Sequence, residues 1–161
     1  MDSDRRAPVR DVVVVLITFA VAGALGALLW HWWWSPAPTG FVFEKRPYFG
    51  PDLEFRSTGT YVVVSAALGL VLGLVLTYLL DRDEVVTLVA LVVGGLLAAG
   101  LMALVGHLLG PESAAEVARG AADGDSVTAD LRVQPGAAYL IFPVAALVGS
   151  LVVLLTFPNR D

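Results

Sequence analysis

Two long apolar segments, residues 61–80 and 85–109, follow each other with a charged joint of four residues, 81–84, between them. Each segment has about the 20 residues that a helix needs to cross roughly 30 Å of hydrocarbon. A joint this short connects antiparallel neighbours. The two segments therefore predict a helical hairpin that crosses a membrane twice, and the rest of the chain is interpreted around it.

Two further apolar segments, residues 12–34 and 137–157, predict two more spanning helices. The first follows a basic start, as a signal peptide does, but its apolar run exceeds the usual 7 to 15 residues and no clean cleavage site follows it. We therefore expect an uncleaved anchor. A hydrophobic content of 57% agrees, because soluble domains have about 45–50%. The prediction is an all-α integral membrane protein, one domain over residues 1–161, folded as a four-helix up-and-down bundle.

The two long loops, residues 35–60 and 110–136, leave the same end of such a bundle and carry strand patterns. Aromatic and charged residues alternate on both sides of a Gly-Pro-Asp turn, which predicts a β-hairpin over about 41–56. Residues 126–133 alternate strictly and predict a strand, after a stretch of helical composition at 112–122. Because two strands alone are marginally stable, we expect the three strands to form one small extracytoplasmic β cap.

Small residues recur at four-residue spacing on the second and third predicted helices, where they favour close helix packing in lipid. The predicted packing residues are Ser65, Gly69 and Gly73 on one helix and Gly95, Ala99 and Ala103 on the other. We expect these two stripes to meet, and glycine faces of this kind also suit a homo-oligomer. The alternative interpretation is that glycine is simply frequent in membrane helices.

Four tryptophans, Trp30, Trp32, Trp33 and Trp34, end the first predicted helix. Indole rings prefer the headgroup layer of a bilayer, where the apolar ring and the N–H group are both satisfied. The cluster therefore predicts a membrane interface. An aromatic platform that binds a sugar or a lipid is the alternative.

The basic residues indicate the orientation. Arg5, Arg6, Arg10, Arg82 and Arg160 fall on the side of the termini, and Lys45, Arg46, Arg56, Arg119 and Arg132 fall in the two long loops. The counts are equal, but the terminal side concentrates its charges in a shorter length of chain close to the helix ends, where they orient a protein. We therefore predict a plasma-membrane protein with both termini in the cytoplasm.

The sequence predicts no catalytic, cofactor-binding or metal-binding residues, and we expect no enzyme. Cysteine is absent, and a net charge of -5 provides no basic footprint for nucleic acid. Ionisable residues are missing from the centres of the spans, which argues against a pump. His31 and His107 with Glu112 or Asp52 form a weak metal hypothesis, since their spacing is undefined.

Residues 55–111 resemble an uncharacterised family of four-helix membrane proteins from actinobacteria, classed as a domain of unknown function. The likeness is carried by the Gly-rich second helix, the Gly94-Gly95-Leu96-Leu97 step, the Val105-Gly106-His107-Leu108-Leu109-Gly110-Pro111 end of the third helix and the Ala-rich acidic loop after it. The resemblance implies a membrane location and a topology, and it assigns no activity.

Our leading hypothesis is a structural or accessory interaction protein of the bacterial cell envelope. The ordered-looking polar sequence lies in the two outer loops, so the expected partners are the lipid bilayer and an envelope protein bound through those loops. A small transporter or channel subunit is the alternative. A membrane enzyme that uses Asp52, Glu54 and Asp130 comes third, because these carboxylates have no paired base or metal motif.

Overall fold

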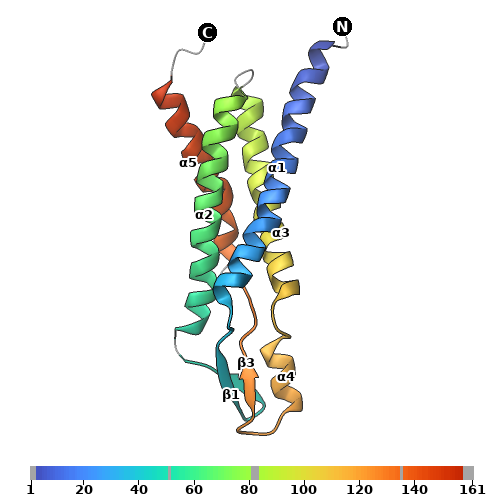
Figure 1. Ribbon diagram of the computed structural model, residues 1–161, viewed down its shortest axis with the longest axis vertical. Helices are drawn as coiled ribbons and strands as arrows, with labels where there is room; N and C mark the ends of the chain where they lie inside the picture. The colour runs from blue at the N-terminus through green and yellow to red at the C-terminus, as the bar shows by residue number, and fades with distance from the viewer. Residues whose placement is uncertain (1–2, 51, 81–83, 135, 158–161) are drawn as a thin grey trace.

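A computed structural model describes residues 3–50, 52–80, 84–134 and 136–157 of the chain. Four long helices run alternately up and down, so the start of the first, the end of the second, the start of the third and the end of the fourth lie at one end (Figure 1). The long helices are α1 (Ser3–Trp34), α2 (Leu53–Leu79), α3 (Glu84–Leu109) and α5 (Ile141–Thr156), the last preceded by the 3₁₀ turn η1 (Gly136–Leu140). All four are long and apolar enough to cross a membrane, which confirms the four predicted apolar helices.

The helices pair as α1 with α3 and α2 with α5, and α3 also contacts α5. The expected meeting of the two stripes of α2 and α3 is therefore wrong for their glycines. A Cβ on Gly69 would lie 2.5 Å from the carbonyl oxygen of Phe142, and one on Gly95 would lie 2.6 Å from Cα of Pro143. Both glycines thus face α5, because its small residues admit the closest approach.

The parts of the two stripes nearer the cap do lie where α2 and α3 touch. The Tyr61 hydroxyl donates to the carbonyl oxygen of Ala99 at 3.0 Å, and Ser65 Oγ lies 3.5 Å from Sδ of Met102. Ala103, another of the predicted packing residues, is half-buried beside Met102. A side-chain layer rather than a glycine contact therefore joins α2 to α3.

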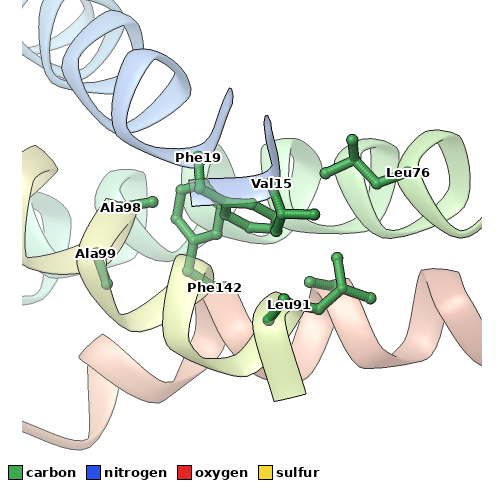
Figure 2. Close-up of a cluster of buried hydrophobic side chains, with 9 residues drawn as sticks. Val15, Phe19, Leu76, Leu91, Ala98, Ala99 and Phe142 are labelled. Carbon is green, nitrogen blue, oxygen red and sulfur yellow. The ribbon is translucent and has the colours of Figure 1, made fainter. Parts of the chain in front are cut away.

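Apolar side chains from all four helices fill the middle of the bundle (Figure 2). Phe19 of α1 and Phe142 of α5 lie with ring centroids 5.7 Å apart, and Leu91 of α3 is fully buried beside them. Gly94 makes room for the Phe19 ring, since a Cβ there would lie 2.9 Å from the ring. The core of the bundle therefore depends on two aromatic rings that cross between helix pairs.

A small cap lies at the end of the bundle where α1 ends and α2 begins (Figure 1). Strands β1 (Thr39–Phe43), β2 (Arg46–Tyr48) and β3 (Ser126–Thr128) form one antiparallel sheet in the order β2-β1-β3. Helix α4 (Ala114–Gly120) packs its alanines against Val42 and Val127 on one face of this sheet. The prediction that both long loops contribute to one three-stranded sheet is confirmed.

The boundaries of the cap strands differ from the prediction. The hairpin turns at Glu44 and Lys45, whose φ angles of 50° and 60° are left-handed, instead of at the Gly-Pro-Asp sequence. Residues from Leu53 onward start α2, where the Arg56 amide already bonds to the Asp52 carbonyl oxygen at 3.0 Å. The predicted hairpin over 41–56 is therefore wrong after Tyr48, and the predicted strand over 126–133 ends at Thr128.

Candidate functional site

Trp30 and Trp34 join the bundle to the cap from inside the protein. Both side chains are buried, and Trp30 Nε1 donates to the Ser57 carbonyl oxygen and to Thr60 Oγ1, each at 3.1 Å. The Trp30 ring also meets the Tyr61 ring edge-on, with centroids 5.3 Å apart. The prediction of an interfacial tryptophan cluster is therefore wrong for these two residues.

Trp32 and Trp33 lie on the outer surface of the same helix end, with exposed fractions of 73% and 49%. The split has a simple cause, since residues four apart share one face of a helix. Trp30 and Trp34 fall on the inward face, and the two tryptophans between them do not. This spacing was present in the sequence and would have separated the two pairs.

The chain from Ala129 to Gln134 ties the cap to the first turns of α2. Ser57 Oγ donates to the Arg132 carbonyl oxygen at 2.7 Å, and the Gln134 amide donates to Thr58 Oγ1 at 3.0 Å. Leu131, in the same segment, is fully buried against Trp30 and Met102. The cap is therefore fixed to the bundle by hydrogen bonds as well as by apolar packing.

A cavity of about 230 Å³ lies at this junction of cap and bundle. Asp130 and Arg132 line it, and they form an ion pair with 3.3 Å between Asp130 Oδ2 and Arg132 Nε. The Ser57 hydroxyl, which also lines the cavity, already donates its hydrogen bond to the Arg132 carbonyl oxygen. Since ligand pockets usually hold about 300–1,000 Å³, this cavity suits ordered water or a very small polar molecule.

The metal hypothesis gains no support from the geometry. Within the described ranges, no three His, Asp or Glu side chains lie close enough together to hold an ion, which includes the sets of His31, His107 and a carboxylate considered above. His107 is exposed on α3, and Nδ1 of His31 is buried without a hydrogen-bond partner. Glu54, named in the enzyme hypothesis, has a side chain outside the described part.

The sheet presents an aromatic face on the side away from α4. Alternation along β1 and β2 sends Val42 inward and sends Phe41, Phe43, Arg46 and Tyr48 outward. The Phe41 and Tyr48 rings stack with centroids 5.9 Å apart, and the Phe43 ring stands against Tyr48 at 6.1 Å. We call Phe41, Phe43 and Tyr48 the aromatic face. The sequence indicated an aromatic hairpin face, but not that it would stay uncovered.

About half of each of these three aromatic residues is exposed, at 53%, 50% and 55%. Contiguous exposed apolar patches mark interaction sites in folded proteins, whereas single exposed apolar residues do not. Arg46 shares the surface and places a positive charge beside the rings. The arrangement is suited to binding another macromolecule.

The chain matches no protein-family model, and comparison with curated proteins and with solved structures gives no match either. The resemblance to a four-helix actinobacterial family stays a prediction. The function must therefore be inferred from the bundle and from the aromatic face of its cap.

Proposed function

We propose that this chain is an accessory protein of the bacterial plasma membrane that binds a protein partner in the envelope through the aromatic face of its cap. The four helices would anchor the cap, and the cap would carry the interaction. The aromatic face is the observation that carries this proposal.

The surface of the bundle supports a membrane location. Each long helix turns large apolar side chains outward, among them Val21, Val71, Val93 and Val148, which are about half exposed. Such a surface on every helix would be costly in water and suits contact with acyl chains. Exposed Trp32 and Trp33 then fall at one end of the spans, where indoles favour the headgroup layer.

The distribution of basic residues supports a cap on the outer side. The terminal side concentrates its arginines near the helix ends, which favours cytoplasmic termini. Because the cap lies at the opposite end of the bundle (Figure 1), it would face the extracytoplasmic space. A partner for the aromatic face would then be an envelope protein.

The composition of the aromatic face supports a protein partner. Tyrosine and arginine are enriched at the energetic centres of protein interfaces, where apolar rings fill pockets on the partner. Phe41, Phe43 and Tyr48 would supply the buried centre, and Arg46 would supply a charged rim. The expected partner presents an apolar surface with a carboxylate beside it.

A transporter or channel subunit is the alternative function. The middle of the bundle is filled by Phe19, Leu91, Ala98 and Phe142, all fully buried. A water-filled path along the axis of one protomer would require these side chains to separate. Flux through proteoliposomes above that of empty liposomes would favour the alternative.

Site-specific photo-crosslinking in native membranes tests the proposal. A photoreactive amino acid at Phe43 is expected to give one discrete adduct with an envelope protein, and the same probe at exposed Glu116 of α4 is the matched control. Replacement of Phe41 and Tyr48 by Ser should abolish the Phe43 adduct. Equal adducts at both positions, or an adduct that survives the double substitution, would contradict the proposal.

A further inference from the structure

Besides the cavity at the junction, a groove of about 510 Å³ runs along α3, where the chain leaves the cap and enters η1 and α5. Residues of α3 line one wall, and the chain from Leu131 to Gln134 lines the other together with Tyr139. The α3 residues are Gly100, Ala103, Leu104 and His107. The groove therefore extends from the apolar span of α3 to the level of the cap.

The lining changes from apolar to polar along the helix axis. The four α3 residues have the spacing of one helix face, and their stripe is about 10 Å long at 1.5 Å per residue. It begins with Gly100 and Ala103 and ends with His107. Leu131, the neighbour of Arg132, meets Gly106 of α3 and Gly110 just after it, so Arg132 lies at the cap end of this stripe. A ligand that fits would be apolar at one end and polar at the other, aligned with the helices.

The apolar end of the groove is open. A Cβ on Gly100 would meet no other atom within 4 Å, although most glycines of the bundle core are packed tightly against a neighbouring helix. Glycine in a helix interior is less favourable than alanine by about 1 kcal/mol. Packing within the protein therefore does not explain Gly100, and an occupant beside it would.

The polar end of the groove carries a cation suited to phosphate. Arg132 pairs with Asp130 through Nε at 3.3 Å, which leaves its terminal amino groups for another acceptor. The Asp130 carboxylate lines the cavity at the junction and does not line the groove. Guanidinium groups bind phosphate through paired hydrogen bonds, and His107, Gln134 and Tyr139 add further polar atoms to the same groove.

We infer that this groove binds an anionic phospholipid, with its phosphate at Arg132 and an acyl chain along Gly100 and Leu104. The inference rests on the membrane location in the proposed function, and it is independent of the partner bound by the aromatic face. The lipid would occupy the leaflet on the side of the cap.

Native mass spectrometry of the full-length protein in detergent tests the inference, with phosphatidylglycerol and phosphatidylcholine as probes. The unmodified protein is expected to retain phosphatidylglycerol in preference to phosphatidylcholine. Arg132→Gln should weaken that binding about tenfold, as expected for one charge-assisted hydrogen-bonded contact. Gly100→Phe should weaken it by a similar factor, because the ring would fill the groove.

Leu96→Phe is the matched control, since Leu96 is exposed on α3 and does not line the groove. It should leave binding unchanged. Gly100→Phe retains the Asp130–Arg132 pair, so it tests the groove even if Arg132→Gln disturbs the cap. Equal retention of the two lipids, or unchanged binding in both groove variants, would overturn the inference.

Three further outcomes identify the ligand and distinguish the failure of this inference from the failure of the proposed function. If glycerol phosphate displaces phosphatidylglycerol as effectively as the lipid itself, the site binds soluble phosphates and the lipid assignment is overturned. If the protein sediments with membranes and crosslinks through Phe43 but retains neither lipid, the groove inference fails and the proposed function stands. If the protein is recovered outside the membrane fraction, both fail.

Discussion

At the residue scale, close backbone approach is the feature that the bundle depends on most directly. A Cβ on Gly73 of α2 would overlap the carbonyl group of Ala146 on α5, and Gly149 of α5 similarly meets the backbone of Leu70. The two helices therefore interlock through reciprocal glycines. Van der Waals contact and weak hydrogen bonds from Cα atoms are the means by which membrane helices associate at such sites.

Gly73→Ala tests this interlock. The added methyl group should force α2 and α5 apart and lower the free energy of unfolding by about 1–3 kcal/mol, as overpacking does in tightly packed cores. Gly59→Ala, on the same helix, is the matched control because a Cβ there meets nothing within 4 Å. Thermal unfolding in detergent should therefore show a loss of stability for the first variant, and no loss for the second.

The same residues show what a sequence can and cannot predict at this scale. The four-residue spacing of Gly69 and Gly73 correctly indicates one closely packed face, but every long helix has such residues and the spacing does not name its partner. The partner is selected by the packing of the whole bundle. The position of the hairpin turn could not be predicted either, because Glu44 and Lys45 lack the Asn-Gly signature of a two-residue turn.

At the element scale, the cap is joined to α2 by the chain between β3 and η1. Ser57 is 4% exposed, and its hydroxyl donates to the Arg132 carbonyl oxygen. Thr58 accepts from the Gln134 amide on the same turn of α2. This junction holds Arg132 between the cavity and the groove. The lipid site proposed there therefore requires the chain at the junction to be well ordered.

Ser57→Ala tests the junction. Loss of the hydroxyl leaves a carbonyl oxygen without its donor, which should cost about 1–3 kcal/mol where the group is buried. Hydrogen exchange is expected to quicken at residues 129–134 and to stay unchanged in the middle of α3. Ser126→Ala, on the exposed side of β3, should have no such effect, and equal acceleration in both variants would contradict the role of Ser57.

The positions of the helices could be predicted from the sequence better than the contacts between them. The apolar segments fix the long helices to within a few residues at most ends, because length and hydropathy alone decide them. Two helix starts are exceptions. Helix α1 begins at Ser3 instead of residue 12, and α2 begins at Leu53 instead of residue 61, although the sequence after Asp52 alternates like a strand. In the next turn of α2, Ser57 and Thr58 bond to Arg132 and Gln134, and no local sequence pattern records these tertiary contacts.

At the scale of the whole molecule, the bundle and the cap have different roles in the proposed function, since the bundle would anchor the protein and the cap would bind the partner. The bundle exposes apolar side chains on each helix, and the cap exposes the aromatic face on a sheet whose other side is covered by α4. The groove beside Arg132 lies between these two surfaces. A lipid bound there would therefore contact both parts and would stabilise the cap against the bundle.

The orientation of the molecule can be tested by cysteine labelling, because the chain contains no cysteine. With the cap outside, an impermeant maleimide should label Ser126→Cys in intact cells and should label Glu84→Cys only after lysis, since both positions are exposed at opposite ends. Ser57→Cys is the matched control for burial. It should stay unlabelled until the protein is denatured, although it lies on the side of the cap.

The reverse labelling pattern would place the cap in the cytoplasm. The aromatic face would then require a cytoplasmic partner, and the proposed envelope interaction would be wrong. The lipid groove would move to the inner leaflet, whose anionic lipids also suit Arg132. The inferred lipid site does not depend on the orientation, so lipid retention and labelling test different parts of the proposal. The labelling result decides in which compartment the partner of Phe41, Phe43 and Tyr48 is found.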